Sequence, residues 1–217
     1  MMLRWSWIGD NVDELAIATV EHLQLTVLSV LLGLVIAVPL AVLIRRRRWL
    51  EGPISGFAGV LYTVPALAAF ALLVPLLGVT SLWTPLLPLA SYSLLVLLRN
   101  TLTGLDSVPE RLREAADGMG YRPVRRFLEV ELPLALPAVV AGIRVATVTN
   151  VGLVTVTALL GRGGLGAFIL DGIRRSIPFP TAIIVGTVGA ILLAVALDLA
   201  LLWVERAVAP WQRRGAA

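Results

Sequence analysis

Hydrophobic residues fill five long runs of the chain, and polar segments separate these runs. The runs cover residues 23–44, 54–77, 82–104, 133–160 and 178–204. A helix rises about 1.5 Å per residue, so about 20 apolar residues cross the roughly 30 Å of hydrocarbon in a bilayer. The pattern therefore predicts an all-α fold with five transmembrane helices, in one membrane domain over residues 1–217.

The composition agrees with a membrane protein and predicts its orientation. Hydrophobic residues make up 58% of the chain, above the roughly half-apolar content of soluble domains. All 18 basic residues are arginine, and twelve of them fall in 45–48, 105–131 and the C-terminal tail. The positive-inside rule then places these segments in the cytoplasm, with the N-terminus outside and the C-terminus inside. The net charge of +4 follows from this topology and does not indicate a nucleic-acid partner.

Residues 1–22 are predicted to form an outer interfacial segment. Acidic residues at Asp10, Asp13 and Glu14 interrupt the apolar core that a cleavable signal peptide needs. Trp5 and Trp7 are typical of a membrane interface, which favours a surface helix leading into the first span. A frayed terminus is the alternative.

The residues typical of catalysis or metal binding are scarce. There is no cysteine, and His22 is the single histidine, so neither a disulfide framework nor a zinc site is expected. No nucleophile and base pair is recognisable in the chain. We therefore expect a protein that is not an enzyme and binds no cofactor of its own.

Residues 105–132 form the long polar segment between the third and fourth runs. Ser107 and Glu110 have the spacing of a capping box, which predicts a helix from about Val108. Gly118 and Gly120 are expected to end it. The apolar stripe of this short helix fits either a lipid surface or a soluble partner.

This segment resembles the EAA loop of membrane subunits of ABC importers. The loop pattern is EAA, three residues, G, nine residues, then I-x-LP; here Glu114-Ala115-Ala116 precedes Gly120, and Val130-Glu131-Leu132-Pro133 follows at the same spacing. Valine in place of isoleucine is the one departure.

The resemblance implies that 105–132 is a cytoplasmic coupling loop, whose helix enters a cleft of an ATP-binding subunit. ATP and magnesium would bind to that subunit, since this chain lacks a phosphate-binding GxxxxGK[ST] loop. The residues expected at the contact are Arg111, Glu114, Ala115, Ala116, Asp117, Gly118, Gly120 and Arg122.

The hexapeptide GRGGLG over 161–166 has the spacing of a dinucleotide-binding fingerprint, but the acidic residue expected about 20 positions later is missing. The chain is instead similar to permeases for glycine betaine, choline and carnitine over most of its length, and these carry GxGGLG near the outer face after the fourth span. We therefore expect a structural role in an outer glycine-rich loop over 161–177, where a binding protein docks. The glycines concerned are Gly161, Gly163, Gly164 and Gly166.

Three charged residues, Arg99, Arg144 and Asp198, fall inside the predicted spans. An unpaired charge deep in a bilayer costs at least about 2.5 kcal/mol. We predict that Asp198 pairs with Arg144 or Arg99, and that the pair fixes helix packing. A proton relay is the less favoured alternative, because no further carboxylates or histidines accompany the pair.

Aromatic and polar side chains in the spans have two interpretations. Tyr62 and Tyr92 could offer aromatic faces to a quaternary ammonium group, or belong to the interfacial aromatic belts. Thr63, Asn100 and Asn150 either face a pathway or form hydrogen bonds between helices.

The sequence thus predicts a permease subunit of an ATP-driven importer in a prokaryotic cell membrane. Its expected partners are membrane lipid, an ATPase, a second permease, identical or homologous, and an external binding protein. The expected solute is a quaternary ammonium osmoprotectant, with an amino acid as the alternative. An autonomous secondary transporter would need ion sites or an inverted repeat, and neither is recognisable.

Overall fold

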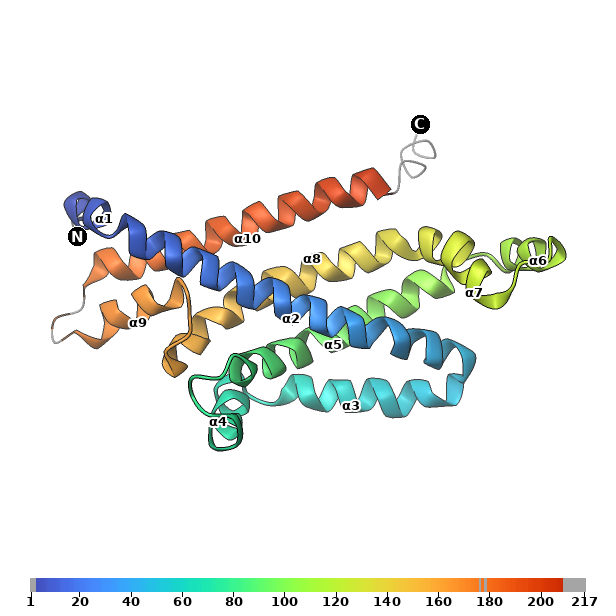
Figure 1. The fold of residues 1–217 in the computed structure, drawn as a ribbon, viewed down its shortest axis with the longest axis horizontal. Helices are drawn as coiled ribbons and strands as arrows, with labels where there is room; N and C mark the ends of the chain where they lie inside the picture. Colours follow the sequence, from blue (N-terminus) through green and yellow to red (C-terminus); the bar gives the residue numbers. More distant parts are fainter. Residues whose placement is uncertain (1–2, 176, 178, 209–217) are drawn as a thin grey trace.

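The computed structural model describes residues 3–175, 177 and 179–208, and these form helices joined by short turns (Figure 1). The described residues contain no β-strand, so the predicted all-α fold is confirmed. Four segments are long and apolar enough to cross a membrane, and a bent helix pair forms a fifth candidate. Residues 209–217 of the predicted C-terminal tail lie outside the described residues, as do position 176 of the predicted outer loop and position 178 at the start of the predicted last span.

The N-terminal helices extend well beyond the predicted first span. Helix α1 (Trp5–Asp10) is followed directly by α2 (Val12–Arg46), whose 35 residues make a helix of about 52 Å. The Trp7 ring packs edge-on against Phe168 and Phe179, with ring centroids 6.0 and 5.3 Å away. The start of the chain therefore packs against the C-terminal third of the protein through Trp7. The Trp5 side chain is exposed.

The second hydrophobic run is broken, whereas the sequence predicts one crossing over 54–77. A short turn, η1 (Arg48–Leu50), leads into α3 (Glu51–Thr63), and α4 (Ala66–Leu77) then departs at 93° to α3. Val64 adopts an extended conformation at the break, with ψ of 129°. The ring of Pro65 disfavours the helical conformation in the residue before it, which explains the bend.

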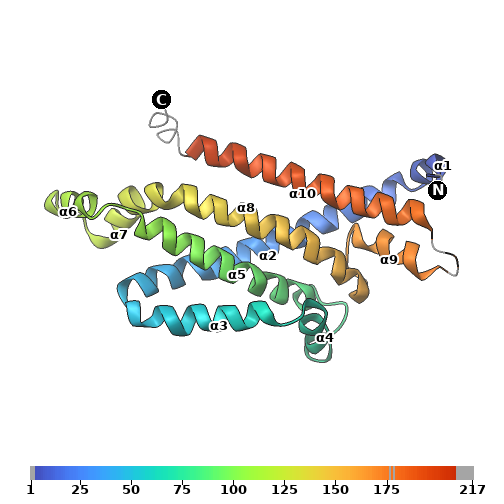
Figure 2. The ribbon, with the colours of Figure 1, turned by 180° about the vertical axis from the view of Figure 1, so that it is seen from behind.

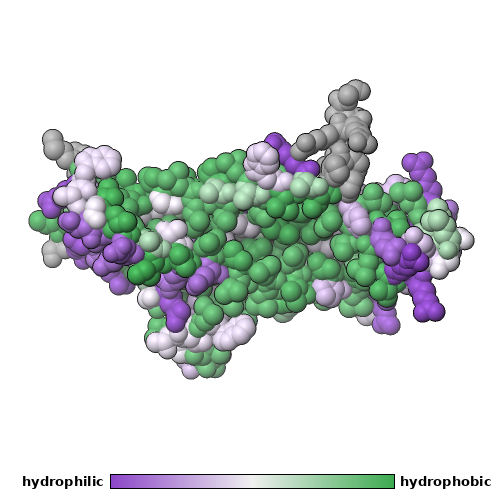
Figure 3. Space-filling model, turned by 45° about the horizontal axis from the view of Figure 1, so that its top comes forward, coloured by the Kyte–Doolittle hydropathy of each residue, from purple (hydrophilic) through white to green (hydrophobic). Residues whose placement is uncertain are grey.

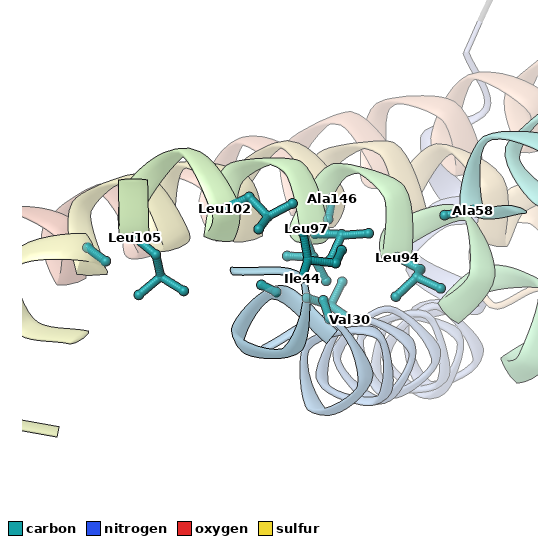
Figure 4. Packing of buried hydrophobic residues seen from close by; sticks show 12 residues of the cluster. Val30, Ile44, Ala58, Leu94, Leu97, Leu102, Leu105 and Ala146 are labelled. Atoms are coloured by element: carbon teal, nitrogen blue, oxygen red, sulfur yellow. The ribbon is translucent and has the colours of Figure 1, made fainter. Parts of the chain in front are cut away.

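Three helices form the centre of the bundle. Helices α5 (Trp83–Asp106) and α8 (Leu132–Val156) lie side by side, and α2 crosses them on one face (Figures 1 and 2). Small residues on α2, including Ala37 and Ala41, are fully buried in one hydrophobic cluster with leucines of α5. Figure 4 shows Leu97 of α5 close to Val30 and Ile44 of α2 in this cluster. Small side chains let the helix backbones approach closely, which is how helices associate in a bilayer.

The remaining elements lie at the two ends and on the flank. Helix α10 (Pro180–Val208) packs on α8 and leaves most of its surface exposed. One end carries α6 (Glu110–Gly118), α7 (Pro123–Arg126) and the π-helical turn η2 (Phe127–Glu131). The opposite end carries η3 (Thr157–Leu160) and α9 (Gly166–Arg174). Figure 3 shows hydrophilic residues gathered toward these ends and a largely hydrophobic band between them.

Candidate coupling surface and membrane-embedded sites

Helix α6 contains the EAA residues and stands at the end of the molecule (Figure 1). It begins at Glu110 after Pro109, and no side chain caps its N-terminus. The predicted capping box is therefore wrong, because Ser107 Oγ donates instead to the Gly104 carbonyl oxygen at the end of α5, at 2.7 Å. Pro109 fixes the helix start, since proline has no N–H to leave unsatisfied.

The C-terminal end of α6 follows the glycines named above. The last helical residue is Gly118, and Gly120 has a φ of +79°. In this left-handed conformation the Tyr121 amide donates to the Ala116 carbonyl oxygen at 3.0 Å. A residue with a side chain would be strained at Gly120, so this glycine sets the sharp turn from α6 into α7.

One face of α6 is turned to the protein and the other is exposed. Ala116 is completely buried, while Glu114 and Ala115 are exposed. Leu112 and Met119 are also exposed, at 38% and 68%. The free face thus combines a carboxylate, a small residue and two apolar side chains, which suits a protein partner. The other residues of the predicted contact, Arg111, Asp117, Gly118, Gly120 and Arg122, are exposed as well.

Arg113 attaches α6 to the end of α5. Its Nη2 donates to the carbonyl oxygens of Leu105 and Val108, at 3.0 and 2.9 Å, and its Nη1 contacts Glu110 at 2.6 Å. Arginine at a helix C-terminus satisfies carbonyl groups that lack a partner within the helix.

A row of ion pairs attaches α6 to the other helices. Asp117 of α6 contacts Arg126 of α7, whose Nε donates to Glu131 Oε1 at 2.8 Å. The second oxygen of Glu131 accepts a hydrogen bond from Arg45 at the end of α2. The row continues to α5 and η1 through contacts of 3.9 Å between Arg45 and Asp106 and of 2.9 Å between Asp106 and Arg48.

Glu131 is a residue that sequence reasoning missed as a site. It is only 4% exposed although it lies near a molecular end rich in arginines. The available signals were a carboxylate next to the Leu132-Pro133 pair and the predicted location of RRRR 45–48 on the same side of the membrane.

Charged residues of α8 and α10, which both belong to candidate membrane spans, contact one another. Arg144 Nε and Nη2 donate to the two carboxylate oxygens of Asp198 at 2.9 and 3.0 Å, and Nη1 donates to Glu205 at 2.8 Å. Arg144 rather than Arg99 is thus the partner of Asp198, and no ion pair of Arg99 occurs among the described residues. A cavity of about 450 Å³ opens beside the pair, lined also by Val145, Val148 and Thr149 of α8.

Asn150 is completely buried where α2, α5 and α8 meet. Its Nδ2 donates to Ser29 Oγ of α2 at 2.7 Å and to Ser93 Oγ of α5 at 2.9 Å. Asn100 also bonds within the protein, to the Val96 carbonyl oxygen at 2.9 Å. The hydrogen bonds of Asn150 join α8 to α2 and α5, which agrees with the interpretation that this residue bonds between helices.

Tyr62 and Tyr92 form an edge-on aromatic pair with centroids 6.1 Å apart. Tyr62 is 43% exposed and Tyr92 only 5%. The Tyr92 hydroxyl donates to the Val64 carbonyl oxygen at 2.6 Å, and Thr63 Oγ1 donates to the Val60 carbonyl oxygen at 2.8 Å. Tyr62 and Thr63 therefore lie exposed beside the break between α3 and α4. Tyr92 stabilises this break through its hydrogen bond to Val64.

The glycine-rich loop packs against α2 and η3. A helical turn precedes it where a dinucleotide fingerprint needs a strand. Gly161 has a φ of +77°, and a side chain on Gly163, Gly164 or Gly166 would overlap Ala158, His22 or Thr155 respectively. The Gly164 amide also donates to Glu21 Oε2 at 3.2 Å. Close backbone approach thus accounts for the glycines without a nucleotide. Of the predicted loop, 166–174 is the helix α9.

The family model of binding-protein-dependent transport system inner membrane components matches residues 29–214. The chain belongs to this family. It is 43% identical over 193 residues to the osmoprotectant import permease protein OsmW of Salmonella typhimurium, covering 87% of this chain and 89% of OsmW. It is 38% identical over 205 residues to the glycine betaine/carnitine/choline transport system permease protein OpuCB of Bacillus subtilis, covering 94% and 93% of the two chains.

The fold also matches a solved structure of the methionine ABC transporter MetNI in an inward-facing conformation. The TM-score is 0.78 at 25% identity, over 89% of this chain and 95% of the other. The chain is therefore a permease subunit of an ABC importer and a multi-pass membrane protein. It is a transport subunit and not an enzyme, and permeases of this family work with a separate ATPase and a binding protein.

Proposed function

We propose that this permease carries a small quaternary ammonium osmoprotectant, of the glycine betaine, choline or carnitine type, into the cell. The names of OsmW and OpuCB support this solute class, since both relatives cover most of the chain. A binding protein delivers the solute at the end that carries the glycine-rich loop and α9. ATP and magnesium bind to the ATPase at the end that carries α6.

The observation that carries the ATPase assignment is the exposed face of α6. Glu114 and Ala115 point away from the protein, and Leu112 and Met119 add apolar surface beside them. Exposed apolar side chains beside polar ones are typical of a surface that binds another protein, which supports a docking role for this short helix.

A second permease, identical or homologous, covers the face formed by α8 and α10. Arg144, Asp198 and Glu205 are 24%, 33% and 23% exposed there. Charged side chains within a span face protein or a water-filled cavity rather than lipid. The cavity of about 450 Å³ beside Arg144 and Asp198 is thus a candidate part of the pathway between the two permeases.

Co-purification tests the ATPase contact. The tagged chain is isolated from its native membrane as wild type, as Glu114→Arg, and as Asp10→Arg, which reverses an exposed carboxylate at the opposite end. We expect an ATPase to accompany the wild type and Asp10→Arg and to be lost from Glu114→Arg. If no ATPase accompanies the wild type, the importer assignment of this surface fails.

Solute uptake tests the substrate class. In proteoliposomes that contain the complete importer, labelled choline should be taken up and unlabelled glycine betaine should compete with it, while labelled methionine should not be taken up. An importer for an amino acid is the second candidate, because the similar fold of MetNI belongs to a methionine transporter. Uptake of labelled methionine without uptake of labelled choline would favour that candidate.

A further inference from the structure

Helix α6 is held to the rest of the protein by two polar attachments. One is Arg113, which bonds to the end of α5; the other is the row of ion pairs that begins at Asp117. Apolar packing contributes little, since Ala116 is the single fully buried residue of the helix. Besides the short chain connections to α5 and α7, these two attachments are therefore the contacts that can transmit a displacement of α6 by a bound partner.

The two attachments lead to different helices. Arg113 reaches α5, which closely precedes α6 in the sequence. Glu131 joins Arg126, next to α6, with Arg45 at the end of α2, 86 residues away in sequence from Glu131. Glu131 is thus the point at which the coupling loop is linked to the first span.

We propose that Glu131 is a positioning residue for coupling, which transmits movement of α6 to the first span, α2, through Arg126 and Arg45. The inference rests on the proposed function of α6 as the ATPase contact. Glu131 uses both carboxylate oxygens, one for each arginine, so neither arginine can shift without pulling on the carboxylate.

The ion pairs of Glu131 are the most buried part of the row that joins α6 to the other helices. The side chains of Arg45 and Glu131 are 14% and 5% exposed, whereas those of Arg48 and Asp106 are 52% and 37% exposed. Exposed pairs contribute little, while a buried pair is strongly disrupted when one partner is removed. The Glu131 contacts are therefore the part of the row that can carry a directed displacement.

The local backbone and the surrounding space suit such movement. Glu131 is the last residue of the π-helical turn η2, a widened turn of a kind that recurs at functional sites. A pocket of about 500 Å³ borders Arg45, Arg126 and Glu131 and reaches apolar Val42 and Phe127. The charged side chains thus have room to shift while they remain paired.

The test compares Glu131→Gln with Glu129→Gln in purified complexes with the ATPase and the binding protein. Glu129 belongs to the same turn, but it is exposed and pairs with Arg125 at 2.9 Å, outside the row. The readout is solute taken up per ATP hydrolysed in proteoliposomes, with the amount of co-purified ATPase measured beside it. A purely structural role would lower the amount of complex and leave this ratio unchanged.

We expect Glu131→Gln to lower the ratio by about 2- to 30-fold, the range found for residues that couple distant sites, and Glu129→Gln to leave it unchanged. Arg45→Gln should give the same defect from the other helix, and the double variant should be no worse than either single variant. An unchanged ratio in Glu131→Gln, with the ATPase still bound, overturns the inference alone. If neither Glu131→Gln nor Arg45→Gln accumulates as a complex, Glu131 serves folding only and the inference is equally overturned. Absence of an ATPase from the wild type instead overturns the proposed function.

Discussion

The hydroxyl of Tyr92 on α5 donates a 2.6 Å hydrogen bond to the carbonyl oxygen of Val64, at the point where the second hydrophobic run bends. Val64 is extended, so its carbonyl group cannot take part in a continuous helical ladder. A backbone group without a partner costs several kcal/mol in hydrocarbon. Tyr92 therefore stabilises the bend between α3 and α4 from a neighbouring helix.

Replacing Tyr92 with phenylalanine should destabilise the protein by about 1–3 kcal/mol, because the Val64 carbonyl group loses its hydrogen bond. Thermal unfolding of the protein in detergent measures the change. Tyr62→Phe is the matched control, since it keeps the edge-on ring pair and removes a hydroxyl on an exposed ring. Equal stability of the two variants would contradict this role of Tyr92.

Removing Arg144 and removing its partner Asp198 should affect the protein to different extents. Arg144→Gln leaves the two carboxylates of Asp198 and Glu205 without their cation, whereas Asp198→Asn leaves Arg144 paired with Glu205. Since a carboxylate at the centre of a span costs about 2.5–3.5 kcal/mol on insertion scales, Arg144→Gln should reduce the assembled protein in membranes far more than Asp198→Asn. Quantitative blotting of membranes measures this.

Arg99→Gln is the control for that comparison, because Arg99 is exposed and has no ion pair within the described part of the chain. Its amount in membranes should match the wild type. Equal losses for Arg144→Gln and Asp198→Asn would show that the bidentate contact, and not the balance of charge, determines assembly.

Gly164 provides a test of the outer loop. Its φ is +47°, and a Cβ atom would lie 2.6 Å from both the Ala18 carbonyl oxygen and His22 Cβ. Backbone strain of this kind costs about 1–3 kcal/mol, so Gly164→Ala should lower the unfolding temperature. Gly152→Ala, at a helical glycine with open space around it, should not. If both variants unfold alike, close approach is not the reason for a glycine at position 164.

Apolar run length was enough to predict the helical membrane fold, because a bilayer permits few other structures for such runs. It could not predict the 93° bend, since uncharged, mostly apolar sequence continues on both sides of Pro65 and only the Val64-Pro65 pair indicated a break. The Ser107 capping box was wrong for a related reason. Local spacing does not reveal that Ser107 turns back to α5.

The candidate site, too, could be predicted from the sequence only in part. The EAA pattern identified α6, because its spacing lies within one continuous segment. Glu131 was missed because its partners come from the end of α2 and from α7, and no local pattern brings Arg45 to it. For Asp198 the cost of an isolated charge narrowed the partner to two arginines, and only the packing of α8 on α10 selects Arg144.

Asn150 allows the pathway and packing interpretations to be separated by experiment. Its side-chain amide bonds to Ser29 and Ser93, and all three residues are buried. Asn150→Ala leaves these hydroxyl groups with one partner fewer and should cost about 1–3 kcal/mol. Thr149→Ala, next to it on α8 and beside the cavity, removes a less buried hydroxyl group and should leave the unfolding temperature near that of the wild type. Transport per assembled complex should be retained in Asn150→Ala, because the residue lies on α8 and bonds to α2 and α5 of its own protein. Full stability combined with loss of transport would instead place Asn150 in the solute pathway.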